Sequence, residues 1–130
     1  VDYVASLEPQ PSETEPLEDP GPIAEFFFET CAPCHRFNGH GEKVFRSAPI
    51  TLLPDWYVIS ALKKYRDGVR GNHPEDETGA KMHEVTAHMA DETISQLASY
   101  LGMLAKKYPF RKTPRHHLQS PVGAMSLEKD

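Results

Sequence analysis

The stretch that decides the fold of this chain lies at residues 31–35 and reads Cys31-Ala32-Pro33-Cys34-His35. It holds both cysteines of the 130-residue sequence, three positions apart, with a histidine directly after the second. Two cysteines this close together cannot form the disulfide framework that staples a small secreted domain. The two thiols and the imidazole therefore indicate chemistry at this stretch rather than cross-linking.

The C-x-x-C-H spacing is the form in which a c-type haem is attached to a protein. Two thiols three residues apart at a helix end can each add to one vinyl group of the same porphyrin, and the next residue presents its imidazole to the iron. A thioredoxin-like redox pair would instead expect a βαβ pattern, and a zinc site would expect a second Cys or His pair at matching spacing. We therefore predict one covalent haem bound through Cys31, Cys34 and His35.

Helical patterns flank this motif on both sides. Helices are predicted over residues 22–34, opened by a proline at its tolerated first position, and over residues 55–67, ended by a glycine. A third is predicted over residues 91–107, which carry an amphipathic stripe. No stretch shows β-strand alternation, so the predicted class is all-α, with the Gly- and Pro-rich segments 38–53 and 68–80 as loops.

Composition and charge exclude several classes of protein. The net charge is −5, with eight acidic and no basic residues in 1–29 and six basic against two acidic residues in 106–130. No basic stripe with interleaved aromatic residues indicates nucleic-acid binding. No apolar run reaches the roughly 18 residues that span a bilayer. Hydrophobic residues make up 38% of the chain, so its core would be lean without a large apolar ligand.

The sequence resembles the small bacterial class I cytochromes c over residues 22–105, and in pattern it is similar to two-domain cytochromes and to cytochrome domains fused to terminal-oxidase subunits. The resemblance is carried by Cys31–His35, Gly39-x-Gly41, Ala48-Pro49, Trp56-Tyr57, Tyr65-Arg66-Asp67-Gly68-Val69-Arg70-Gly71, Gly79-Ala80-Lys81-Met82 and Ser99-Tyr100-Leu101. It implies the class I cytochrome c fold, in which three main helices and their loops wrap around one haem c. It also implies a single-electron carrier rather than an enzyme.

By the same resemblance, Met82 is the distal axial ligand opposite His35. A thioether is a soft, neutral ligand that favours ferrous iron, and His/Met ligation raises the reduction potential. Met89 is the nearest rival but occupies a position where the family usually has leucine. Six further histidines are alternative ligands, of which the one following Met82 is the strongest: His40, His73, His83, His88, His116 and His117. An open sixth position would instead indicate a haem peroxidase or a gas sensor, and a purely structural haem is a third alternative.

Other positions receive roles around the haem from the resemblance. The Pro49 carbonyl is expected to accept the second ring N–H of His35, as ligating histidines normally require. Trp56, Tyr57 and Arg70 are expected near the haem propionates, where buried carboxylates need donors, with ordinary core aromatics as the alternative for the first two.

The resemblance also bears on helix packing. It places Phe28 and Tyr100 at the crossing of the first and last helices. Ala24 stands where the family commonly has a glycine at that crossing, and Ala90 stands where it has a capping serine.

Residues 1–7 resemble the end of a cytochrome's last helix, and residues 8–22 carry five prolines and five acidic residues. The chain begins at Val1 without an initiator Met or a signal peptide. We therefore expect three parts: the end of a preceding domain with an extended linker over 1–21, the cytochrome domain over 22–108, and a polar C-terminal arm over 109–130. The expected partner is a redox protein or a neighbouring domain, and the isolated domain is expected to be monomeric. Haem c is attached outside the bacterial inner membrane, which predicts the periplasm or a membrane-tethered protein facing it.

Overall fold

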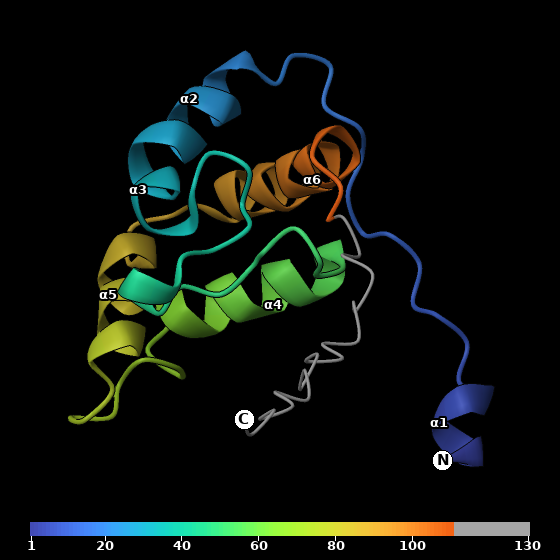
Figure 1. Cartoon of the computed structure of the whole chain (residues 1–130), viewed down its shortest axis with the longest axis horizontal. Helices are drawn as coiled ribbons and strands as arrows, with labels where there is room; N and C mark the ends of the chain where they lie inside the picture. Colours follow the sequence, from blue (N-terminus) through green and yellow to red (C-terminus); the bar gives the residue numbers. More distant parts are fainter. Residues whose placement is uncertain (111–130) are drawn as a thin grey trace, which may run out of the picture.

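The computed structural model describes residues 1–110, and the regular elements in that range are helices (Figure 1). They are α1 (Asp2–Ser6), α2 (Gly21–Thr30), α3 (Ala32–His35), the 3-10 turn η1 (Lys43–Phe45), α4 (Asp55–Arg66), α5 (Glu77–Thr86) and α6 (Asp91–Lys107). The predicted all-α class is confirmed. Most of the predicted C-terminal arm lies outside the described residues.

Helix α6 is the centre of the domain. It lies between α2 and α4 and packs against both (Figure 1). Its apolar stripe is buried and forms most of the core: Ile94, Leu97, Ala98, Leu101 and Leu104. The remaining buried apolar side chains come from the elements around it: Ile23, Phe27, Val58 and Met89. The predicted helices over 55–67 and 91–107 therefore have the expected positions and bounds to within a residue.

The crossing of α2 and α6 uses a different phenylalanine from the one predicted. Phe27 is 2% exposed and its ring centroid lies 5.4 Å from that of Tyr100, whereas Phe28 is 67% exposed. Phe27 lies four residues after Ile23, so the two share one face of the helix and are buried together. The prediction of Phe28 was wrong by one position, because three consecutive phenylalanines do not reveal which one faces the core.

The first predicted helix is divided into two. Helix α2 ends at Thr30, and α3 begins at Ala32 after Cys31. Pro33 explains the division, because it lacks the N–H that a continuous helix would need and is tolerated only in the first turn of a new helix. Because the helix ends and a new one begins at this point, His35 is the last residue of the short helix α3.

Helix α5 was missed, because its sequence follows a loop rich in glycine. The Asp76 carboxylate caps it by accepting the Gly79 N–H at 2.8 Å. The preceding loop passes close to this turn: a Cβ on Gly71, whose φ is +74°, would lie 2.1 Å from the Gly79 oxygen. Met82 therefore lies in a helix that the sequence patterns did not predict.

The start of α6 depends on the end of α4. The Arg66 guanidinium donates to the Asp91 carboxylate at 2.5 Å and to the Met89 carbonyl at 3.2 Å. The hydrogen bond from Arg66 holds the pKa of Asp91 below its usual value. Asp91 is the first residue of α6, so its N-cap is Ala90, whose side chain cannot accept a cap hydrogen bond.

None of the helices among residues 1–110 is long and apolar enough to cross a membrane.

Replacing Ala90 with Ser is expected to raise the free energy of unfolding by about 1 kcal/mol. Ala90 already has the extended backbone of an N-cap, with φ −72° and ψ 157°, so a hydroxyl there can accept a free N–H of the first turn. Urea unfolding of the haem-loaded protein measures the change. Ala80→Ser inside α5 is the control and is expected to lower the same quantity by about 0.5 kcal/mol. Equal effects of the two changes would contradict the capping argument.

Candidate functional site

The two cysteines lie one helical turn apart at the junction of α2 and α3. Both are free thiols; Cys31 packs against the core and Cys34 is exposed. Burial raises the pKa of the Cys31 thiol to about 12, and the neighbouring Cys34 adds to the shift. At neutral pH, Cys31 is therefore a neutral thiol on the inner side of the site, and Cys34 is its partner on the solvent side.

The orientation of His35 is set by its backbone acceptor. The Nδ1–H of His35 donates to the carbonyl of Ala48, with 2.9 Å between the two atoms. This bond fixes the tautomer and leaves Nε2 with its lone pair free to bind a metal. The predicted acceptor was the carbonyl of Pro49, and the structure corrects it by one residue.

Backbone and side-chain hydrogen bonds hold the segment around Ala48 in register. Glu42 and Ser47 exchange N–H···O bonds of 3.2 and 3.1 Å, and the Ile50 N–H donates to the Gly39 carbonyl at 2.8 Å. The Ser47 hydroxyl donates to the carbonyl of Cys34. Because both neighbours of the Ala48–Pro49 pair are bonded elsewhere, the Ala48 carbonyl is left facing the His35 ring.

Gly41 makes this approach possible. Its φ is +77°, and a Cβ there would lie 2.5 Å from the Ser47 oxygen and 2.7 Å from the Ala48 carbonyl carbon. Its N–H donates to the His35 carbonyl at 3.0 Å. A side chain at residue 41 would therefore separate the histidine from its acceptor.

The segment that carries Ala48 also exposes an unusual number of large apolar side chains: Val44, Phe45, Leu52, Leu53 and Tyr57. Exposed apolar residues gathered in one place indicate a surface that a ligand or a partner covers. They lie on both sides of Ala48, whose carbonyl orients His35, so an apolar group attached at the two thiols is expected to contact this segment. Thiols, imidazole and apolar wall together fit a haem. The sequence signal that was overlooked is the apolar run in a loop otherwise rich in Gly and Pro.

Comparison with known families agrees with this arrangement. The family model described as Cytochrome c matches residues 22–105, which is more than half of the chain. The chain belongs to the cytochrome c family. No curated protein and no solved structure gives a significant match. Family membership implies a haem-binding electron carrier, and the two cysteines of this cytochrome are consistent with haem c.

The methionines of this cytochrome have different surroundings. Met89 is 8% exposed and belongs to the core cluster, so it is already used for packing. Met82 is half-buried on α5, where the Thr86 hydroxyl donates to its carbonyl at 2.8 Å. Figure 1 shows α5 and α3 at the same end of the molecule. Met89 is thus committed to packing, and the role of Met82 as an iron ligand stays a prediction.

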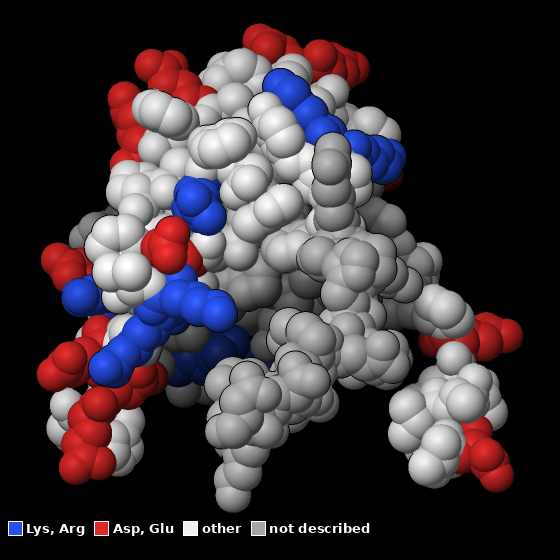
Figure 2. All heavy atoms as spheres, in the orientation of Figure 1, with Lys and Arg blue, Asp and Glu red and all other residues white. Residues whose placement is uncertain are grey.

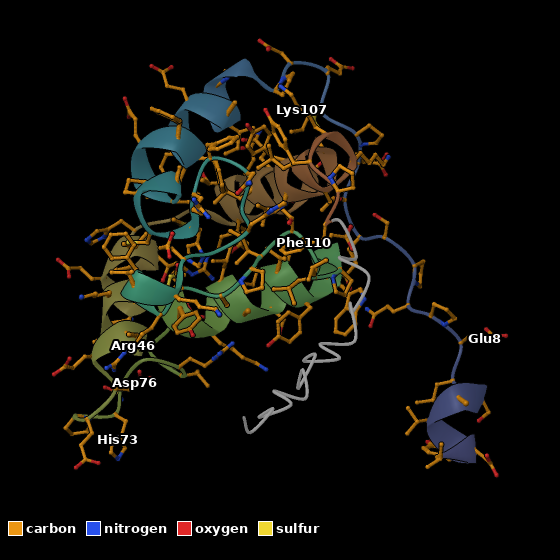
Figure 3. The ribbon with its side chains drawn as sticks, viewed as in Figure 1. Glu8, Arg46, His73, Asp76, Lys107 and Phe110 are labelled. Atoms are coloured by element: carbon orange, nitrogen blue, oxygen red, sulfur yellow. The ribbon has the colours of Figure 1, made fainter. Side chains whose placement is uncertain are left out.

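The described histidines other than His35 lie in separate surroundings. His83 Nδ1 donates to the Tyr65 carbonyl at 2.6 Å, at the end of α4. His40 bonds the Tyr108 carbonyl and stacks on Phe110 with 3.9 Å between the ring centroids. His73 lies at the outer tip of the loop before α5, away from α3 (Figure 3), and His88 is exposed. His116 and His117 lie outside the described residues. Within residues 1–110, no three His, Cys, Asp or Glu side chains are grouped as a metal site requires.

The three residues predicted near the propionates have protein partners. Trp56 and Tyr57 pack edge to face, and Trp56 also lines an open groove along α4. The Arg70 guanidinium lies 4.5 Å from the centroid of the Tyr65 ring. These contacts place the three side chains along α4 and the loop after it, and their role toward a propionate stays a prediction.

Replacing Gly41 with Ala is expected to lower the free energy of unfolding of the haem-loaded cytochrome by at least about 1 kcal/mol, because a left-handed backbone disfavours a Cβ. The close contacts with residues 47 and 48 add to the loss. Urea unfolding followed by helical circular dichroism measures it.

Gly102→Ala is the matched control. Gly102 lies inside α6, and a Cβ there would meet no heavy atom within 4 Å. This change is expected to raise the free energy of unfolding by about 0.5–1 kcal/mol. Equal losses at the two glycines would contradict the role given to Gly41.

Proposed function

We propose that this cytochrome is a single-electron carrier with one haem c, attached to Cys31 and Cys34 and ligated by His35 and Met82. The observation that carries the proposal is the hydrogen bond from His35 Nδ1 to the Ala48 carbonyl within a C-x-x-C-H motif. When bound, the haem supplies an iron that changes between the ferric and ferrous states by one electron.

The protein's own groups do the remaining work. The two cysteine sulfurs hold the cofactor covalently, so it is not lost when its charge changes. The Ala48 carbonyl raises the basicity of the His35 ring and keeps it from rotating. The exposed apolar side chains of residues 44–57 would be covered by the cofactor and would exclude water from its edge.

The assignment of Met82 rests on the surroundings of its rivals. Met89 is committed to the core, and the Nδ1 of His83 is bonded to the end of α4. A neutral thioether favours the ferrous state and raises the potential. Two protein ligands on the iron also favour electron transfer over catalysis or gas binding, because no ligand has to leave during the redox step.

Replacing Met82 with Ala is expected to abolish the sulfur-to-iron charge-transfer band of the oxidised visible spectrum and to lower the reduction potential. Met103→Ala is the control, because Met103 is 40% exposed on α6. The control variant is expected to keep both the band and the potential. Persistence of the band in the Met82 variant would show that another residue is the ligand.

The reduced wild-type protein is expected not to bind carbon monoxide at neutral pH, because both axial positions are filled by side chains. Absorbance in the Soret region on addition of the gas measures binding. The Met82→Ala variant serves as the positive control and is expected to bind it. Fast stoichiometric binding by the wild type would favour a peroxidase or a gas sensor instead.

We further propose that the protein works outside the bacterial inner membrane, beside a redox partner or a neighbouring domain. Helix α1 supports the second possibility, since its apolar side chains lie in solvent: Tyr3, Val4 and the adjoining Leu7 are each more than half exposed. Asp and Glu side chains lie along the end of the molecule that carries α2 (Figure 2), which favours a cationic partner surface at that end.

A further inference from the structure

The carboxylate of Asp55 accepts hydrogen bonds from the segment that precedes the domain. Oδ2 of Asp55, the first residue of α4, accepts hydrogen bonds from Ser12 Oγ at 2.5 Å and from the Glu13 N–H at 2.9 Å. It also accepts the N–H of Thr14 at 2.9 Å and its hydroxyl at 2.8 Å. The other oxygen, Oδ1, accepts the Trp56 N–H at 2.7 Å. A single side chain thus joins the start of α4 to residues more than forty positions earlier.

The same segment continues along the domain after this point. The Ser99 hydroxyl of α6 donates to the Glu15 carbonyl at 2.9 Å, and Leu17 packs against the hydrophobic core. Thr14, Leu17 and Pro20 are partly buried, while the residues between them are exposed. The partly buried residues thus recur at every third position, which is the period of a polyproline II helix. The prolines of this segment favour that conformation. One face of the segment is therefore in contact with the domain through α4 and α6.

The contact at Asp55 persists at neutral pH. Burial acts to raise the pKa of this carboxyl, but hydrogen bonds from Ser12, Thr14 and Trp56 lower it to about 2. The carboxylate is therefore ionised under ordinary conditions and can accept from all of its donors. Two of these donors are backbone N–H groups of the preceding segment, those of Glu13 and Thr14, so the contact orders its main chain as well as its side chains.

We propose that residues 12–17 are an anchored strap of the cytochrome domain and that Asp55 is the residue that positions it. Only residues 7–11 then separate α1 from the anchored part, and two of these five are prolines. Five extended residues span at most about 18 Å. Figure 1 shows the strap passing α6 on its way to α1, which stands clear of the domain. Any body that includes α1 is thus held near the start of α4, and does not move on a free tether of the fourteen residues 7–20.

Hydrogen exchange of the full chain, resolved by residue, tests the strap. The amides of Glu13 and Thr14 are expected to exchange at least tenfold more slowly than that of Gln10, for which the described residues provide no acceptor. Asp55→Asn replaces an acceptor by a donor facing two N–H groups and is expected to remove this difference. Amides of α6 are expected to stay protected in the variant, which shows that the domain remains folded.

Asp19→Asn is the matched control, because it makes the same change of charge in the same acidic segment. Asp19 accepts only the Gly21 N–H among the described residues, so this variant is expected to leave the amides of Glu13 and Thr14 protected. If Asp55→Asn does not fold, Ser12→Ala combined with Thr14→Val removes two of the four bonds and is expected to speed exchange several-fold.

The proposal is wrong if Glu13 and Thr14 exchange as fast as Gln10 in the wild-type chain. It is also wrong if the amides of Glu13 and Thr14 exchange at the wild-type rate in the Asp55→Asn variant or, where that variant does not fold, in the Ser12→Ala/Thr14→Val variant. Neither result depends on haem ligation or electron transfer, so the strap and the proposed function can fail separately.

Discussion

The hydrogen bond between His35 Nδ1 and the Ala48 carbonyl requires two stretches of backbone to lie almost in contact, and the rest of the site depends on that approach. Gly41 permits it, because no side chain separates the stretches. The bonds of Ser47 and Ile50 fix which carbonyl faces the ring. On both sides of Ala48, the apolar side chains that would cover a cofactor are exposed. The conformation of the loop that carries Ala48 therefore both orients the His35 ring and presents the apolar side chains that would cover the cofactor.

Much of this architecture could be predicted from local sequence signals. The helices α4 and α6 have long amphipathic stripes with clear ends, and the C-x-x-C-H spacing has few other uses. Helix α5 lacks such a signal: it follows a loop rich in Gly and is ten residues long with an internal glycine. The division at Cys31 was also foreseeable, since Pro33 cannot lie in the middle of a continuous helix. The family assignment follows from the motif and its context and is confirmed over residues 22–105.

Other features depend on contacts between distant residues and could not be read from the sequence. Which phenylalanine faces Tyr100 is decided by the rotation of α2, and which carbonyl faces His35 is decided by hydrogen bonds on either side of it. The acidic segment before α2 reads as a linker by composition, because nothing local shows that Asp55 holds it. The predictions of Phe28 and of the Pro49 carbonyl were each wrong by one residue because tertiary packing decides these contacts, although the predicted fold was right.

The burial of Cys31 has a consequence for the reactivity of the two sulfurs. A thiol reacts as its thiolate, and burial raises the pKa of Cys31 to about 12, so this thiol stays protonated at neutral pH. Cys34 lies three residues away and is exposed. The two sulfurs of one short motif therefore differ in access, and an electrophile arriving from solution meets Cys34 first.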